Sequence, residues 1–316
     1  MAKILIHIVA HKTATSSIQW TLRENKAYFE GTHNISIITT TQFLDLDIKK
    51  HFQKLASRQG FSDKLEFSKS IKAAKNSIEP LLHPNKYNVI SYEGFMGHSN
   101  LAEYEGLYNP TIGNSLREIF ADHNLKVILT IRRQDEFINS CYLQQVKESK
   151  KLSFEDFTAR IPATNISWTR ITNELEISLG ENNLLVLPME FVSHVGILEF
   201  IAQMLEFFNN SKIKIDQNLK TFYRNNSISK LGVDIYDLMR QHLDKKNRAI
   251  IAQILYTHFS SRKFGKHNFF TEFFKNAIIQ NCIQSNAEIF TKNFNKLSRD
   301  SFLDSCEHVK KHYGIV

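Results

Sequence analysis

The feature that most constrains the fold is the junction between an apolar segment, residues 4–9, and a polar segment, residues 11–17, which reads HKTATSS. The apolar segment is typical of a buried β-strand. Beyond the polar segment, Ile18, Leu22 and Phe29 recur at helical spacing. The sequence therefore predicts a strand, a tight loop and a helix. Backbone N–H groups and the positive end of the helix dipole converge in such a loop, and Lys12 adds a cation, so the loop is suited to bind a phosphate-like anion.

The order of residues within this loop distinguishes between kinds of anion site. In a Walker A loop the lysine follows the second glycine, whereas here Lys12 precedes the small residue Ala14. This order resembles the 5′-phosphosulfate-binding loop of the sulfotransferases, and the His-Lys-Thr start resembles their bacterial carbohydrate branch. Ala14 stands where the family has glycine, so the ligand has to approach past a Cβ. A capped helix after an ordinary strand is the alternative. The resemblance implies that the 5′-phosphosulfate is held by Lys12, Thr13, Ala14, Thr15, Ser16 and Ser17.

A second motif follows another apolar segment, residues 127–131. Arg132 comes directly after this predicted strand, and Ser140 lies on the helix expected beyond it. Ligands of open parallel sheets bind at the carboxyl edge of the sheet. In sulfotransferases an arginine and a serine in this order bind the 3′-phosphate of 3′-phosphoadenosine 5′-phosphosulfate (PAPS), which implies the same role for Arg132 and Ser140. Arg133 departs from the family pattern, and it either adds a phosphate contact or faces solvent.

Glu93 is the candidate general base. It follows a short predicted strand, residues 88–92, and many carbohydrate sulfotransferases have a catalytic glutamate or histidine at this place. Partial desolvation between Tyr92 and Phe95 suits a carboxylate for proton transfer near neutral pH. A solvated loop carboxylate is the alternative, and His11 and His98 are then the candidate bases.

Two weaker motifs lie in the carboxyl-terminal third of the chain. Arg262 and Lys263 belong to a basic loop with a glycine, similar to the loop that covers the adenine and the 3′-phosphate in cytosolic sulfotransferases. The resemblance implies that both bind the nucleotide, and a solvated charged face is the alternative. Ser227 is predicted to cap the start of a helix.

The alternation of strands and helices predicts an α/β fold with three layers, in which a central parallel sheet is flanked by helices as in P-loop proteins. A further strand is expected at residues 184–187, and a helix at residues 168–179 that ends at Gly180. No repeat and no Pro/Gly/Ser-rich linker divides the chain. We expect one domain over residues 1–316, with a nucleotide-binding α/β core at 1–200 and a mainly helical completion at 201–316.

Composition narrows the class of protein. The 316 residues with 42% hydrophobic content can bury a full core, and the apolar amino-terminal run is too short for a signal peptide or a membrane anchor. Cys141, Cys282 and Cys306 form no CxxC pattern and are predicted to be reduced core thiols. These features favour a cytoplasmic protein without a transmembrane segment, and peripheral attachment at the inner membrane surface is left open. The net charge of +8 favours polyanionic partners, among them nucleotides, acidic glycans and nucleic acids.

Together the motifs predict a sulfotransferase that moves a sulfuryl group from PAPS to a hydroxyl or amine of a bacterial saccharide or glycolipid, without a required metal. By the resemblance, Lys12 donates to the leaving oxygen and Glu93 or His11 accepts the acceptor proton. A small phenol or sterol is the alternative acceptor. A P-loop kinase would need a Mg²⁺-binding aspartate at a strand end, and the predicted strands offer none. A non-enzymatic nucleic-acid-binding protein would need a basic helix or an aromatic-basic stripe, and no stable nucleic-acid partner is expected.

Overall fold

The computed structural model describes residues 1–9, 15–43, 45–57, 60–96, 101, 111–161, 166–223, 227–266 and 268–315. Within them, five parallel strands form one sheet in the order β2-β3-β1-β4-β5. The strands are β1 (Lys3–Val9), β2 (Ile35–Ile38), β3 (Tyr87–Ser91), β4 (Asn124–Ile131) and β5 (Leu184–Pro188). The predicted α/β class with a central parallel sheet is confirmed.

Helices make up most of the remaining described chain. In the amino-terminal part they are α1 (Thr15–Glu24), α2 (Lys26–His33), α3 (Thr40–Phe43), α4 (Asp47–Leu55), α5 (Lys64–Ile78), α6 (Ile112–Ile119), α7 (Gln134–Lys147), α8 (Phe154–Thr158) and α9 (Thr169–Leu179). The remainder are α10 (Phe191–Val195), α11 (Ile197–Asn209), α12 (Lys230–Arg240), α13 (Lys245–His258), α14 (Ser261–Phe264), α15 (Glu272–Phe294) and α16 (Asp300–His312). Short 3-10 turns occur at η1 (Glu79–Leu81), η2 (Glu93–Met96) and η5 (Glu181–Asn183).

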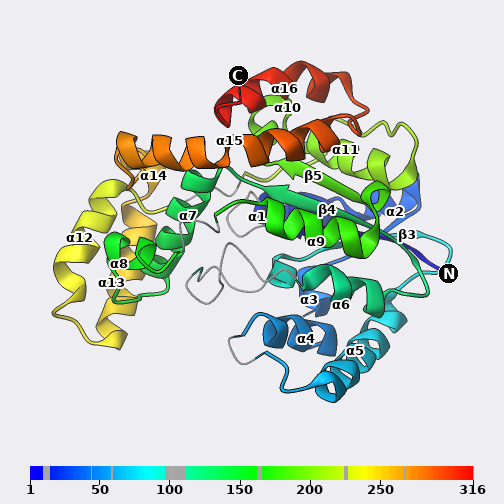
Figure 1. Cartoon of the computed structure of the whole chain (residues 1–316), viewed down its shortest axis with the longest axis horizontal. Helices are drawn as coiled ribbons and strands as arrows, with labels where there is room; N and C mark the ends of the chain where they lie inside the picture. Colours follow the sequence, from blue (N-terminus) through cyan, green and yellow to red (C-terminus); the bar gives the residue numbers. More distant parts are fainter. Residues whose placement is uncertain are drawn as a thin grey trace.

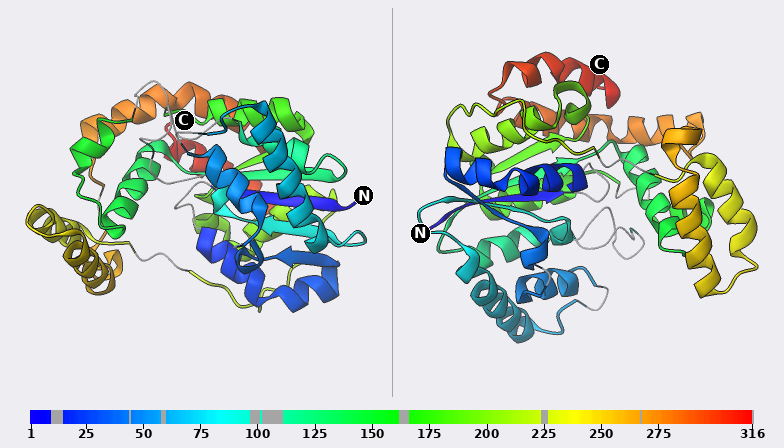
Figure 2. Two further views of the ribbon diagram at one scale, coloured as in Figure 1. Left: turned by 90° about the horizontal axis from the view of Figure 1, so that it is seen from below. Right: turned by 180° about the vertical axis from the view of Figure 1, so that it is seen from behind.

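The helices form layers on both faces of the sheet. Helices α6 and α9 lie in front of the sheet in Figure 1, and α1, α2 and α11 lie on the opposite face, which the right-hand view of Figure 2 shows. The strands begin near the amino terminus and their carboxyl ends point toward a group of helices made of α7, α8, α12, α13 and α14 (Figure 1). The long helix α15 connects that group with β5 and α16. The carboxyl edge of the sheet therefore faces the middle of the molecule.

The four strands expected from the sequence are present with boundaries shifted by a residue or a few. The strand β2 was not predicted, because four apolar or small residues give too short a pattern to separate a strand from a loop. Its residues Ile35, Ile37 and Ile38 are buried. The predicted first helix is divided in two at Asn25, whose side chain donates to the carbonyls of Thr21 and Lys220.

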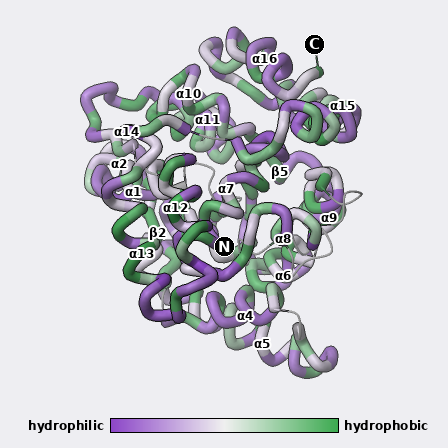
Figure 3. Tube along the Cα trace, turned by 90° about the vertical axis from the view of Figure 1, so that its left-hand side faces the viewer, coloured by the Kyte–Doolittle hydropathy of each residue, from purple (hydrophilic) through white to green (hydrophobic). Residues whose placement is uncertain are grey.

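The core follows from the apolar character of the strands. Every residue of β5 is buried, as are the last five residues of β4, which is typical of parallel strands covered on both faces. The outer helix α16 alternates hydrophilic and hydrophobic residues (Figure 3), and its buried Phe302, Cys306 and Val309 recur at helical spacing. All three cysteines are buried and free, as predicted, and Gly180 ends α9 at φ +87°. No helix among the described residues is long and apolar enough to cross a membrane.

The carboxyl-terminal helices hold the edge of the sheet and the start of α7. On the β5 edge, Asn293 of α15 accepts a hydrogen bond from the backbone N–H of Val186 at 2.8 Å, which satisfies a group that an open edge would expose. Gln134 at the start of α7 and Asn286 of α15 exchange two side-chain hydrogen bonds, at 2.9 and 3.2 Å. The carboxyl-terminal helices thus fix the position of the helix that follows β4.

A histidine joins the three central strands. His7 on β1 is fully buried, and its Nδ1 and Nε2 lie 3.0 Å from the Ser91 hydroxyl on β3 and 2.9 Å from the Thr130 hydroxyl on β4. Burial lowers the pKa of His7 to about 3. The ring is therefore neutral and serves as a polar bridge across the sheet.

We expect the free energy of unfolding to fall as the pH drops below about 6.5. Between about pH 3 and pH 6.5 the unfolded chain protonates His7 while the folded chain does not, so the unfolded state binds more protons and stability rises with pH over that window. Going from about pH 7.5 to about 5.5, His7 alone lowers the stability by about 1.4 kcal/mol. His51, whose pKa burial lowers to about 4, acts in the same direction. Urea unfolding at the two pH values measures the change in stability. The stability of the His7→Gln variant should depend less on pH than that of the wild type. An equal pH dependence in both proteins would contradict the role of His7 in this loss of stability.

Candidate functional site

Arg132 and Ser140 lie side by side at the carboxyl edge of the sheet. Arg132 follows the last residue of β4, and Ser140 is on α7, eight residues further on. The Arg132 Nη1 donates to the Ser140 Oγ at 2.7 Å. Both side chains are partly exposed. A guanidinium and a hydroxyl thus meet at one point, and both are groups that donate hydrogen bonds to a phosphate.

Glu136 holds the Arg132 guanidinium in this orientation. The Arg132 Nε and Nη2 donate to the Glu136 Oε2 at 3.1 and 2.8 Å, one helical turn from the strand end. Burial alone would raise the pKa of Glu136, but the His312 hydrogen bond and the charges of Arg132 and Arg133 keep that pKa well below its usual value. The Trp168 indole N–H donates to the backbone carbonyl of Arg132 at 2.8 Å. The arginine is therefore fixed before any ligand arrives.

Arg133 faces neither the site nor solvent, which corrects both expectations for it. Only 9% of the residue is exposed. Its Nε and Nη2 donate to the two carboxylate oxygens of the fully buried Asp135 at 2.6 and 3.0 Å, and its Nη1 donates to the His312 carbonyl at 2.9 Å. Both arginines contact the Glu136 carboxylate, but Arg132 does so from the side of Ser140 and Arg133 from the side of Asp135 and His312.

A group of three side chains behind Arg132 has a geometry that suits a metal ion. One ligand atom of each of Glu136, Glu190 and His312 lies within 4.8 Å of the others. Arg132 and Arg133 already neutralise the Glu136 carboxylate, and the Tyr313 hydroxyl donates to Glu190 at 2.9 Å. Burial raises the pKa of Glu190, against the opposing charges of Arg132 and His312. This charge balance suits a structural network better than a cation site.

The predicted phosphosulfate loop is only partly within the described residues. His11, Lys12, Thr13 and Ala14 lie outside them. The flanking elements are those expected, since β1 ends at Val9 in the middle of the sheet and α1 begins at Thr15. Of the two serines that follow, Ser16 is exposed and Ser17 is buried. The roles of the six loop residues stay predictions.

Glu93 lies directly beyond β3, at the start of the turn η2, and is half-buried. The buried rings of Tyr92 and Phe95 lie on either side of it in the chain, with ring centroids 5.4 Å apart. The Tyr92 ring folds against Gly94 so closely that a Cβ there would approach it to 2.3 Å, so the turn requires glycine. A carboxylate at this strand end is thus held on a tightly packed turn. His98, the other candidate base, lies outside the described residues.

Among the described residues, no contact links Arg262 or Lys263 to Arg132. They are exposed on α14, a short helix where a loop was expected, which ends at Gly265 with φ +79°. The Arg262 Nη2 donates to the Tyr223 carbonyl at 3.2 Å. The predicted cap at Ser227 is wrong: Ser229 caps α12, and the Ser227 hydroxyl donates to the Ser261 hydroxyl. Ser229 is the better cap because its side chain reaches the N–H of Gly232 on the first turn.

Sequence reasoning missed Glu136 and Trp168 as parts of this site. The spacing of Glu136, four residues after Arg132, was a usable signal, since residues at that distance on a helix are neighbours. No local signal existed for Trp168, which directly precedes α9 and reaches Arg132 through the fold alone.

No protein-family model and no curated protein matches the chain. Among solved structures, it is similar to a sulfotransferase from Alicyclobacillus acidocaldarius, with 11% sequence identity, a TM-score of 0.41, and coverage of 81% of this chain and 96% of that chain. It is also similar to retinol dehydratase in complex with androsterone and the inactive cofactor PAP, with 14% identity, a TM-score of 0.36, and coverage of 91% of this chain and 80% of that chain. Similarities of this degree assign no role to a residue of this chain.

Proposed function

We propose that this protein is a PAPS-dependent sulfotransferase that acts on a hydroxyl or amine of a saccharide or glycolipid. The observation that carries the proposal is the contact between Arg132, at the end of β4, and Ser140 on α7. Their sequence order and their place at the carboxyl edge of a parallel sheet match a 3′-phosphate site, and their donors meet at one point. On one side β4 pairs with β1, whose end leads toward the HKTATSS segment.

This order of strands supports one orientation of the nucleotide. Neighbouring strands lie about 4.8 Å apart. A nucleotide with its 3′-phosphate at Arg132 can therefore place its 5′-phosphosulfate at the end of β1, beside Lys12 and the start of α1. The backbone N–H groups of residues 13–16 and the helix dipole would hold the 5′-phosphate there.

The proposed reaction transfers the sulfuryl group in line. The acceptor oxygen or nitrogen forms a bond to sulfur while the bond from sulfur to the bridging oxygen of the phosphosulfate breaks. The leaving nucleotide keeps that electron pair, and Lys12 stabilises the developing charge on the oxygen, a contribution of about 3 kcal/mol to the barrier by analogy with preorganised donors. Glu93 accepts the proton that the acceptor loses, which typically contributes about 10² to 10⁴ in rate.

Two features support this function over a kinase. Within the described residues, the strand ends are followed by Thr39, Tyr92, Arg132 and Met189, and none supplies the aspartate that positions Mg²⁺ in P-loop kinases. In the proposed site Arg132 and Ser140 would bind a 3′-phosphate, which ATP lacks. With a glycolipid acceptor, the net charge of +8 would favour peripheral contact between a cytoplasmic enzyme and the anionic inner membrane surface.

Calorimetric titration tests the proposal with three nucleotides. We expect 3′-phosphoadenosine 5′-phosphate (PAP) to bind at least about tenfold more tightly than AMP, because one charge-assisted phosphate contact contributes about 1.5–3 kcal/mol. Mg²⁺ should leave the PAP affinity unchanged. Tighter binding of ATP in the presence of Mg²⁺ would favour a kinase instead. Tight oligonucleotide binding with a steep salt dependence, unaffected by PAP, would favour a nucleic-acid-binding protein.

A further inference from the structure

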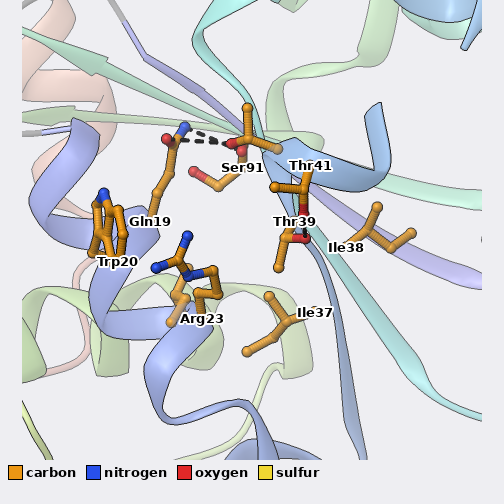
Figure 4. A pocket seen from close by; sticks show the side chains of 10 residues that line it. Gln19, Trp20, Arg23, Ile37, Ile38, Thr39, Thr41 and Ser91 are labelled. Carbon is orange, nitrogen blue, oxygen red and sulfur yellow. Dashed lines mark hydrogen bonds between the residues drawn. The ribbon is translucent and has the colours of Figure 1, made fainter. Parts of the chain in front are cut away.

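A pocket of about 240 Å³ lies between α1 and the carboxyl ends of β2 and β3. We propose that it binds one neutral sugar ring of the acceptor, an inference that rests on the proposed function. Figure 4 shows Trp20 and Arg23 of α1 on one side of the pocket and residues at the ends of the two strands on the other. Gln19, Trp20, Arg23, Thr39 and Thr41 are among the side chains that line the pocket.

The pocket lies on the opposite side of β1 from Arg132. Its wall includes Ser91, the last residue of β3 and two residues before Glu93. With strands about 4.8 Å apart, the end of β3 is roughly 10 Å from the end of β4, and the end of β1 lies between them. A ring held in this pocket therefore approaches the end of β1 from the side away from the 3′-phosphate site. In-line transfer requires the acceptor and the nucleotide on opposite sides of sulfur.

The polar groups of the pocket are held in fixed positions. The Gln19 Nε2 donates to the Ser91 carbonyl at 3.1 Å, and both groups lie at the pocket wall (Figure 4). The hydroxyls of Thr39 and Thr41 lie 2.8 Å apart. Hydroxyls that both donate and accept are the partners that the hydroxyl groups of a sugar need. A few fixed polar groups beside apolar side chains are typical of small-molecule sites.

The remaining wall favours a neutral ring. Leu22, Ile37 and Ile38 supply apolar surface for the C–H groups of a sugar. Trp20 and Arg23 form the opposite wall as a stacked pair, with the guanidinium 3.3 Å from the centre of the Trp20 ring. The Arg23 Nη2 and Nε donate to the Glu24 carboxylate at 2.8 and 3.1 Å. Since Glu24 already balances this charge, the arginine serves as a hydrogen-bond donor and does not select an anion.

The volume of the pocket matches one sugar ring. Pockets that bury drug-sized molecules measure about 300–1,000 Å³, and this one is smaller. It accommodates a single six-membered ring with its substituents.

The two tryptophans of the chain report on the two halves of the proposed site separately. Trp20 lines the pocket, and the Trp168 indole donates to the Arg132 carbonyl. In ¹H–¹⁵N spectra of the full chain, the Trp20→Phe variant lacks one of the two indole N–H signals, and this loss assigns both. We expect glucose and N-acetylglucosamine to shift the Trp20 signal and cyclohexanol, a ring without the hydroxyl rim, to leave it in place. PAP should shift the Trp168 signal.

The variant Thr39→Val removes a pocket hydroxyl and keeps the branched shape of the side chain. It should weaken sugar binding by about threefold to tenfold, the range for one neutral hydrogen bond, and leave PAP binding unchanged. The matched control Thr257→Val, on the exposed face of α13, should change neither. The pocket assignment is overturned if no sugar shifts the Trp20 signal, or if cyclohexanol shifts it as much as a sugar does. In either case a PAP-induced shift of the Trp168 signal would still support the nucleotide site. Failure of PAP to bind overturns the proposed function instead.

Discussion

Arg132→Ala is expected to weaken the binding of PAP by about tenfold to a hundredfold. The variant removes a charge-assisted contact of about 1.5–3 kcal/mol, and the Ser140 hydroxyl alone cannot replace the guanidinium. The stability of the fold should change little, because Glu136 keeps Arg133 and His312 as partners at 3.2 and 3.1 Å. Calorimetric titration with PAP measures the affinity, and thermal unfolding checks that the variant is folded.

AMP provides the control for this prediction, because it has the same base and sugar but no 3′-phosphate. Its affinity should be the same for the wild type and for Arg132→Ala. Arg132→Lys should give an intermediate PAP affinity, since an ammonium keeps the charge and loses the planar fork. Equal losses for PAP and AMP would mean that Arg132 acts on the site as a whole and does not read the 3′-phosphate.

Arg133→Ala is expected to lower the free energy of unfolding by about 3–5 kcal/mol. The change leaves the fully buried Asp135 carboxylate without the cation that contacts both of its oxygens. It also removes the donor to the His312 carbonyl, which ties α16 to the turn after β4. Total stabilities of proteins are about 5–15 kcal/mol, so the loss should be evident in chemical denaturation.

Two further variants separate the ion pair from side-chain loss in general. Arg160→Ala, at an exposed position, should stay within about 0.5 kcal/mol of the wild type. Replacing both partners, as in Arg133→Met with Asp135→Leu, should recover much of the lost stability, because apolar side chains of similar volume can replace a buried ion pair. If Arg133→Ala were as stable as Arg160→Ala, the buried pair would have no structural role.

Much of the fold was predictable because its signals are local. The apolar runs that became β1, β3, β4 and β5 are long enough to identify strands, and the predicted helix before Gly180 ends there. The strand β2 escaped prediction because four residues carry almost no periodicity, and pairing with β3 is what stabilises it. The position of Arg132 at a strand end and of Ser140 on the next helix likewise followed from spacing along a single segment.

What the tertiary structure decided is the direction of neighbouring side chains. Arg132 and Arg133 are adjacent and chemically identical, yet one contacts Ser140 while the other is buried against Asp135. The sequence by itself determined that an arginine directly follows β4, because the apolar run stops at Ile131. It could not determine where Arg133 points, because that depends on His312, which contacts this turn from the far end of the chain. Local patterns specify elements, and only long-range packing specifies where each side chain of a turn points.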